Sequence, residues 1–308
     1  MRNFFAHQIT ELAKCDPRII LLSGDIGNKL FDDFKKVDSA RFFNCGIAEG
    51  AMMSVAAGMA LSGMRPFIYT ITPFTTARCF EQIRIDVCYH SAPVVIVGTG
   101  SGLSYAELGP THHSLEDLAI LRTLPGMQVL APCDSLEMQV LMKCAVDSGK
   151  PTYIRIGKKG EPDIYEAMPI LSIGKASIIK KGTRVAILCA GIVMPIALEV
   201  SNLVADNLGF SPEVVSLHTI KPLDNCYLVE AVGRFDLLVT VEEHGLIGGL
   251  GSAISEWLHS SQATTKLICV GTPDEFMHEV GSQNYARSKY GLNTESIVSK
   301  IYSELARY

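Results

Sequence analysis

A single carboxylate stands at the start of a segment made almost entirely of small and apolar residues. Residues 41–63 have the sequence RFFNCGIAEGAMMSVAAGMALSG, in which Glu49 separates a strand-like run from a helix-like run. An acid in the first turn of a helix is stabilised by the helix dipole, which is a sufficient structural reason for Glu49. A buried carboxyl group can also share a proton with a ligand nitrogen, because burial raises the pKa of a carboxyl group. This segment alone leaves both interpretations open.

Apolar runs that alternate with helical patterns predict the elements around Glu49. Buried strands are expected at 18–23, 41–44, 65–70, 92–99, 127–132 and 151–156. Helices are expected at 49–62, 76–89, 114–123 and 134–147. Asp134, followed by Glu137, is typical of a helix N-terminus. Because the strands are apolar on both faces and alternate with helices, they predict a parallel sheet covered on both sides.

The pattern restarts after a stretch rich in Lys, Gly and Pro at residues 158–184. Four further strands are expected beyond it, at 184–191, 212–219, 236–244 and 266–271. We therefore predict an α/β protein with two doubly wound domains, residues 1–173 and residues 174–308.

Composition narrows the class of protein. The 308 residues are 48% hydrophobic and 19% charged, which is enough to bury a sizeable core. A net charge of -5 without a basic run argues against nucleic acid or an anionic membrane as a partner, and the apolar runs are too short to span a bilayer. The nine cysteines form no Cys-x-x-Cys pair and the eight histidines show no zinc spacing. We expect reduced thiols, a cytoplasmic protein and no metal site in this chain.

Several segments, in order, resemble the transketolase family. They are residues 44–70, 73–84, 109–132 (GPTHHSLEDLAILRTLPGMQVLAP), 153–157 (YIRIG), 214–224 and 239–254. The likeness covers nearly the whole chain and is strongest to the C-terminal chain of split transketolases, in which two polypeptides form the enzyme. It implies a pyrimidine-binding domain followed by a transketolase C-terminal domain.

The resemblance also implies a cofactor, thiamine diphosphate, and roles for particular residues. Glu49 would hydrogen-bond the aminopyrimidine N1′ and promote loss of the proton from the thiazolium carbon. Phe74 would stack on the aminopyrimidine, and Ile47 would join these two residues in binding the cofactor. His112 would reach the reaction centre and bind substrate or move a proton. Arg155 would bind a substrate phosphate, because its planar fork matches phosphate oxygens.

The likeness extends only to the C-terminal half of one-chain family members. In the family, Mg²⁺ and the diphosphate are held by a Gly-Asp-Gly motif and a downstream Asn in the N-terminal half. The segment SGDIGNKL at residues 23–30 is no equivalent in place or partner. The resemblance therefore implies an N-terminal transketolase-like subunit that holds the diphosphate and Mg²⁺, and an α2β2 heterotetramer.

Two positions depart from the family pattern. Leu108 stands where an Asp is usual, and Gly100 stands where split transketolases tend to have a His. Both polar residues read sugar hydroxyls in the family, and an unmade buried hydrogen bond is costly. Ordinary pentose-phosphate transfer is therefore in doubt. Glu107 or Tyr105 could substitute for them, and a less hydroxylated donor such as pyruvate is equally compatible.

Other residues of these segments are expected to be structural. Arg78 and Glu81 should pin their helix to its neighbours rather than touch substrate, and His244 should serve the fold. We assign no role to His113.

Three functional hypotheses follow. The chain is the C-terminal subunit of a transketolase-like enzyme that moves a two-carbon ketol or related acyl unit, the beta subunit of a 2-oxoacid or acetoin dehydrogenase component, or a non-catalytic scaffold. The sequence of residues 109–132 favours the first hypothesis. The presence of Glu49, Phe74 and His112 argues against the third.

Overall fold

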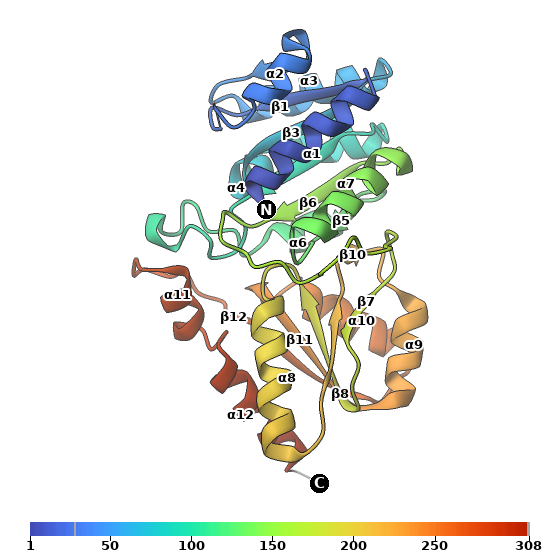
Figure 1. The fold of residues 1–308 in the computed structure, drawn as a ribbon, viewed down its shortest axis with the longest axis vertical. Helices are drawn as coiled ribbons and strands as arrows, with labels where there is room; N and C mark the ends of the chain where they lie inside the picture. The colour runs from blue at the N-terminus through green and yellow to red at the C-terminus, as the bar shows by residue number, and fades with distance from the viewer. Residues whose placement is uncertain (28, 307–308) are drawn as a thin grey trace.

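The predicted apolar strands assemble into two sheets in the computed structural model, which describes residues 1–27 and 29–306 (Figure 1). Within these residues the first sheet has seven strands in the order β10-β5-β6-β4-β3-β1-β2. Their bounds are β1 (Ile19–Ser23), β2 (Phe42–Asn44), β3 (Arg65–Ile71), β4 (Val95–Thr99), β5 (Gln128–Leu130), β6 (Thr152–Ile156) and β10 (Thr219–Lys221). All neighbours are parallel except β10 and β5, so the expected parallel sheet is confirmed.

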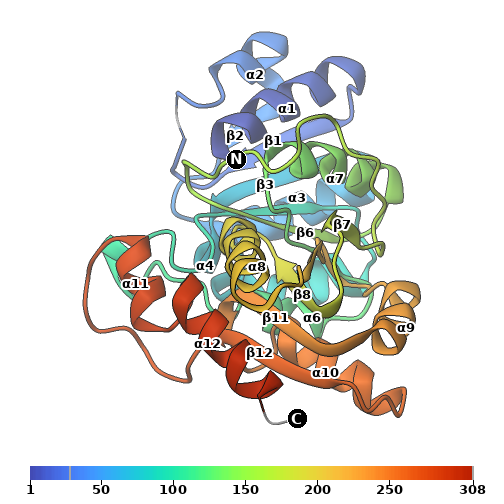
Figure 2. The same ribbon diagram turned by 60° about the horizontal axis from the view of Figure 1, so that its bottom comes forward.

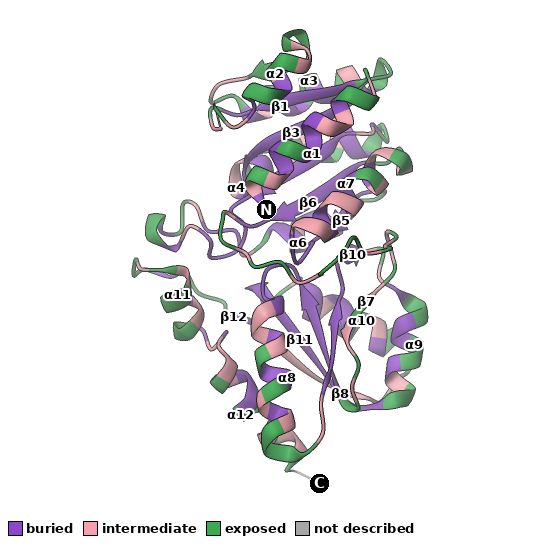
Figure 3. Cartoon of the chain, viewed as in Figure 1, coloured by how far each residue is buried: buried purple, intermediate pink, exposed green. Residues whose placement is uncertain are grey.

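Helices cover both faces of the first sheet. One face packs against α1 (Arg2–Cys15), α2 (Asp32–Val37) and α7 (Ser135–Ser148), with Phe5 and Leu141 among the buried residues. The other face packs against α3 (Glu49–Leu61), a helical segment at 72–89 and α6 (Asp117–Arg122), with Met53 and Ile83 buried there. Except for β2 at the edge, whose residues are half-buried or exposed, the strands between them are buried along almost their whole length, as Figure 3 shows in purple.

The second sheet has five strands in the described residues, in the order β12-β11-β8-β9-β7. Their bounds are β7 (Ser177–Lys180), β8 (Arg184–Ala190), β9 (Glu213–Ser216), β11 (Phe235–Gly245) and β12 (Lys266–Thr272). Helices α8 (Met194–Leu208) and α12 (Thr294–Leu305) cover one face, and α9 (Asn225–Arg234) and α10 (Leu250–Ser260) cover the other. In both views α11 (Gln283–Lys289) lies beside the loop that follows β4 (Figures 1 and 2).

One strand of the C-terminal half belongs to the first sheet. β10 pairs antiparallel with β5, with Thr219 opposite Leu130. The Lys221 ammonium then donates to the carbonyl oxygens of Arg122 and Leu124, at 2.9 and 2.6 Å. One continuous apolar core includes residues of α3, α6, α9 and α10, so the two sheets share a core.

The prediction of one regular helix at 76–89 is wrong. The segment is broken into α4 (Thr72–Thr75), a 3₁₀ turn (Ala77–Cys79), α5 (Phe80–Gln82) and a π-helical stretch (Ile83–Tyr89). The hydroxyls of Thr75 and Thr76 both donate to the carbonyl oxygen of Thr72, at 3.1 and 2.7 Å, and such bonds compete with a regular helix. Among the described helices, none combines the length and the apolar character that crossing a bilayer demands.

Asp134 caps α7 as expected and also holds the chain that links the sheets. Its Oδ1 accepts from the backbone N–H of Glu137 at 2.8 Å, while Oδ2 accepts from those of Ile164 and Tyr165 at 2.8 and 3.0 Å. The Glu137 carboxylate instead accepts from the backbone of Cys133. Asp134 is fully buried, so all three backbone donors depend on it.

We predict that Asp134→Ala lowers the free energy of unfolding by about 2–4 kcal/mol, because a helix cap is lost and buried donors are left unpaired. Asn293→Ala is the matched control, since Asn293 caps α12 through one backbone N–H in the described part of the chain. It should cost about 1 kcal/mol. Urea unfolding of both variants checks this, and equal losses would contradict the linker role of Asp134.

Candidate active site

The predicted site residues follow neighbouring strands at the carboxyl edge of the first sheet. Glu49 begins α3 just after β2, Phe74 lies in α4 directly after β3, and His112 lies in the loop after β4. In open parallel sheets this edge is where ligands bind, since the loops that leave it converge there. The topology therefore brings together three residues that are far apart in the sequence.

Glu49 is placed by a tight turn between β2 and α3. Gly46 has φ +65°, a left-handed conformation that a side chain disfavours, and this turn leads directly into the helix. The Glu49 side chain is only 5% exposed, although it lies at the end of a helix. Arg78 Nη1 donates to both of its carboxylate oxygens, each at 3.0 Å. The acid of the opening segment is thus buried and ion-paired.

Three aromatic rings, each in contact with the next, lie beside this ion pair at the edge of the sheet. The Arg78 guanidinium carbon lies 4.2 Å from the centre of the Phe74 ring. Phe74 meets His112 edge to face with ring centres 5.4 Å apart, and His112 meets Tyr105 in the same way at 6.0 Å. We call Glu49, Phe74, Arg78, Tyr105 and His112 the site cluster.

Two neighbours set the chemistry of the site cluster. The Thr111 hydroxyl lies 2.9 Å from His112 Nδ1, which fixes the ring from one side. The Cys79 thiol donates to the carbonyl oxygen of Phe74 at 3.1 Å, and burial raises the pKa of Cys79 to about 12. Cys79 therefore stays protonated near neutral pH and is not a nucleophile.

Ile47 precedes Glu49 by two residues and its side chain is 81% exposed.

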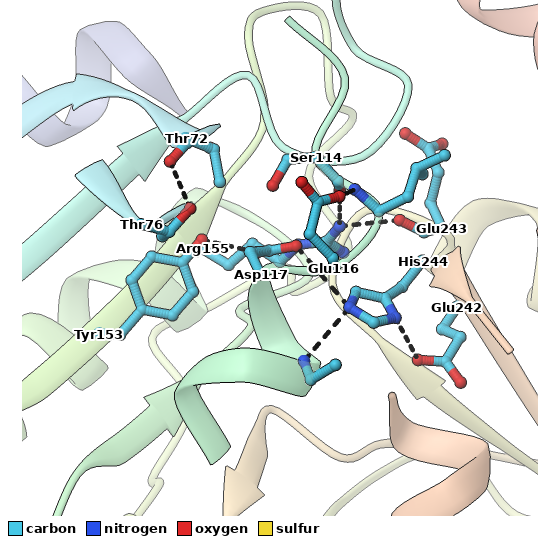
Figure 4. A network of polar contacts seen from close by, with 12 residues as sticks. Thr72, Thr76, Ser114, Glu116, Asp117, Tyr153, Arg155, Glu242, Glu243 and His244 are labelled. Carbon is cyan, nitrogen blue, oxygen red and sulfur yellow. Dashed lines mark hydrogen bonds and ion pairs between the residues drawn. The ribbon is translucent and has the colours of Figure 1, made fainter. Parts of the chain in front are cut away.

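Arg155 is not part of the site cluster. Its side chain is 2% exposed and packed between the two sheets (Figure 4). Nε donates to Asp117 Oδ2 at 2.9 Å, and Nη2 donates to the carbonyl oxygens of Ser114 and Glu243 at 3.0 and 2.8 Å. Burial opposes the charge of Arg155, but Asp117, Tyr153 and Glu243 together offset this, and the pKa of the guanidinium is raised. This geometry does not support the phosphate-binding role predicted from YIRIG.

The network around Arg155 holds the loop that carries His112. Tyr153 donates to Asp117 Oδ2 at 2.6 Å, and the Glu243 carboxylate accepts from the backbone N–H of Leu103 at 2.6 Å. Gln283 of α11 donates to the same carboxylate at 2.9 Å. Both ends of the 100–116 loop are therefore tied to the C-terminal half of the chain.

His244 belongs to this network rather than to the site cluster. Its Nε2 accepts from the backbone N–H of Ala119 at 3.3 Å, and Nδ1 lies 2.8 Å from the carbonyl oxygen of Gly245. The ring is fully buried, which agrees with the structural role expected for it. His113 is also buried, and burial lowers its pKa.

Tyr105 fills the space that a side chain at position 100 would occupy. Gly100 has φ +71°, and a Cβ added to it would lie 1.9 Å from Tyr105 Cε2. The Lys158 ammonium lies 4.3 Å from the centre of the Tyr105 ring and forms an ion pair with Glu107. Lys158 holds the pKa of Glu107 below its usual value. Next to Gly100, this side of the site cluster is therefore formed by the Tyr105 ring.

Sequence reasoning did not place Arg78 and Tyr105 in the site cluster. Arg78 joins its segment to α3 through Glu49, as expected, but it also lies against Phe74. Phe74 and Arg78 lie in two separate short turns, so regular helical spacing gave no signal for this contact. Tyr105 was named only as a possible substitute, since no pattern in the sequence indicates which side chain fills the space beside a glycine.

The site cluster fits an aminopyrimidine. Glu49 and Phe74 together already accept a flat group that donates N–H bonds in its plane and presents a π face, which is the Arg78 guanidinium. An aminopyrimidine has the same two features. In the described residues no group of three or more His, Cys, Asp or Glu side chains is arranged as metal ligands.

Comparison with known proteins identifies the family. Residues 1–161 match the family described as "Transketolase, pyrimidine binding domain", and residues 174–297 match "Transketolase, C-terminal domain". The chain belongs to the transketolase family. The expected family, the α/β fold and the order of the two domain types are confirmed.

The chain is similar to proteins of about its own length and to proteins about twice as long. A subunit of the apulose-4-phosphate transketolase of Phocaeicola vulgatus is 36% identical over 298 residues, which cover 96% of this chain and 94% of that subunit. A solved structure described as "Split gene transketolase, inactive beta4 tetramer" is 34% identical with a TM-score of 0.88, and the match covers 99% of this chain and 97% of that one. 1-Deoxy-D-xylulose-5-phosphate synthase of Acidobacterium capsulatum is 32% identical over 306 residues, which cover 98% of this chain but 48% of that enzyme.

We predict that Arg155→Met lowers the free energy of unfolding by about 3–5 kcal/mol, because Asp117 is left buried without its partner. The double variant Arg155→Met/Asp117→Asn should recover part of the loss, since the unpaired charge is removed. Urea unfolding measures both. A stable Arg155→Met chain whose assembled enzyme loses affinity only for phosphorylated substrates would restore the phosphate role.

Proposed function

We propose that this chain is the C-terminal subunit of a split, thiamine diphosphate-dependent transketolase-like enzyme. The enzyme transfers a two-carbon ketol or related acyl unit to an aldehyde or sugar acceptor. The observation that carries the proposal is the site cluster, in which a buried glutamate, a stacking aromatic ring and a histidine meet at the carboxyl edge of the first sheet. The relatives are transketolase subunits and a synthase, which favours this hypothesis over a 2-oxoacid dehydrogenase component.

Each residue of the site cluster has a defined task in this proposal. Thiamine diphosphate, when bound, supplies the nucleophilic carbon that carries the transferred unit. Glu49 holds a proton against the pyrimidine N1′, and its burial excludes the water that would compete for that bond. Phe74 orients the ring by stacking, and Ile47 adds an apolar contact. His112, held by Thr111, binds the substrate oxygen or moves its proton.

The proposed enzyme needs a second chain. This chain spans about half the length of the Acidobacterium synthase, but nearly all of the Phocaeicola subunit. We propose that an N-terminal transketolase-like subunit holds the diphosphate and Mg²⁺, and that two copies of each chain form a heterotetramer. The related structure of a beta4 tetramer is described as inactive, which agrees with activity only in the presence of the partner.

The exposed face of α3 supports self-association. Ile47, Ala51, Val55 and Gly58 recur along one side of the helix and the turn before it, and all four are exposed. Val55 is 49% exposed, and a Cβ on Gly58 would meet no atom within 4 Å. Small and apolar side chains at this spacing suit close packing against another copy of the chain.

The substrate differs from an ordinary ketose phosphate in this proposal. Leu108 is 48% exposed, and Tyr105 and Lys158 line the place of the missing side chain at Gly100.

A cytoplasmic location is also part of the proposal. All nine cysteines are free thiols, as is usual in a reducing compartment.

We predict that Glu49→Gln lowers kcat of the assembled enzyme by about 100- to 10,000-fold, because the proton shared with N1′ is lost. The measurement is turnover with the partner subunit, thiamine diphosphate and Mg²⁺, together with sedimentation to verify assembly. Glu81→Gln is the matched control, since Glu81 is exposed and pairs only with Arg84 in the described contacts. A loss of only severalfold would contradict the proton role, and undiminished activity would favour the scaffold hypothesis.

We predict that Gly58→Arg blocks self-association without unfolding the chain, because its side chain would enter the packing face rather than the core. Gly233→Arg is the control, since Gly233 in α9 also has open space around it. Arg is a better helix former than Gly, so neither change should weaken its helix. Sedimentation velocity should show a smaller particle only for Gly58→Arg. An unchanged particle would exclude α3 from the interface.

A further inference from the structure

Arg78 makes two contacts of different kinds, an ion pair and a cation–π contact. Its Nη1 lies 3.0 Å from both oxygens of Glu49, and its guanidinium carbon lies 4.2 Å from the centre of the Phe74 ring. Glu49 is 5% exposed, whereas the Arg78 side chain is 47% exposed. The guanidinium therefore lies on the solvent side of the buried carboxylate and covers it.

These two contacts are the ones that the proposed function assigns to the aminopyrimidine. A guanidinium is flat, donates N–H bonds in its plane and offers a π face for stacking. An aminopyrimidine in hydrogen-bond contact with Glu49 needs a carboxylate oxygen of that residue, and Arg78 bonds both. The ring also needs a face of Phe74, and the guanidinium lies against one. Cofactor and guanidinium therefore compete for the same groups.

We propose that Arg78 takes the place of the cofactor's aminopyrimidine as long as no cofactor is bound, and that thiamine diphosphate binds only when Arg78 leaves Glu49. The inference rests on the proposed function and assigns Arg78 a part in it. Arg78 thereby keeps the buried charge of Glu49 paired in the chain before the cofactor arrives. It is a positioning residue, since it acts through Glu49 and Phe74.

The local structure allows Arg78 to move. It lies in the short 3₁₀ turn Ala77–Cys79, which follows a break at Thr76 (φ -112°, ψ -82°), so no continuous helix restrains it. A half-exposed ion pair is weak compared with a buried one, because water screens it and the long side chain gains freedom on release. The Arg155–Asp117 pair, with both partners buried, lacks this freedom.

The test is the affinity of the assembled enzyme for thiamine diphosphate. Arg78→Met removes the charge and the planar donors but retains a flexible side chain. Titration calorimetry of the complex with its N-terminal subunit, in the presence of Mg²⁺, measures Kd without any need for turnover. We expect Arg78→Met to lower Kd by roughly five- to thirtyfold, since a half-exposed ion pair and a cation–π contact no longer oppose binding.

Arg84→Met is the matched control. Arg84 lies six residues further along the same segment, is also half-exposed and pairs with Glu81 at 3.0 Å. Its Kd should stay within about twofold of that of the unaltered enzyme. Arg78→Lys, which keeps the charge but not the flat donor group, should fall between the unaltered enzyme and Arg78→Met.

The possible results distinguish a failure of the proposed competition at Glu49 from a failure of the proposed function. Unchanged or weaker binding by Arg78→Met would overturn the competition, and weaker binding would mean that Arg78 helps to hold the cofactor. An equal effect of Arg84→Met would overturn it as well, because the change would then reflect the charge of the whole segment. Absence of cofactor binding by the unaltered complex would overturn the proposed function, and this inference with it.

Discussion

The buried ion pair between Arg155 and Asp117 is the contact on which the arrangement of this chain depends. Two charges without access to water are tolerable only when they are paired and hydrogen-bonded. Arg155 donates to groups from both halves of the chain, and Asp117 accepts from Arg155 and Tyr153 through Oδ2. The Glu243 backbone joins it from the second sheet. The same network ties down the 100–116 loop, so the position of His112 follows from a contact that lies outside the site cluster.

The site cluster shows how one departure from a family pattern is absorbed. A glycine at position 100 would leave a gap in the wall of the site, yet the Tyr105 ring fills it from five residues away. The side of the site next to Gly100 is therefore an aromatic face with the Lys158 ammonium against it.

Sequence patterns predicted most of the strands and the two α/β halves, because these depend on local periodicity; β7 and β10 were not predicted. Glu49, Phe74 and His112 were singled out by the resemblance to the transketolase family. Sequence patterns did not predict the burial of Arg155, since an arginine at the end of a strand has the same pattern whether it faces a ligand or an inner carboxylate. The broken helix at 76–89 was also missed, because threonine hydroxyls that bond back to a carbonyl leave no mark on hydrophobic spacing. Both features depend on polar side-chain contacts, which hydrophobic spacing does not indicate.

The shared strand β10 has a consequence for how the chain folds. It is covalently part of the C-terminal half, yet it forms the edge of the first sheet, and the carbonyl oxygen of the preceding residue, His218, accepts from the backbone N–H of Ala131. Separation of the halves at the linker would leave β5 paired with β6 alone and expose unpaired backbone groups along its other edge, which promotes aggregation. During synthesis the first sheet therefore lacks its edge strand until residue 221 has emerged.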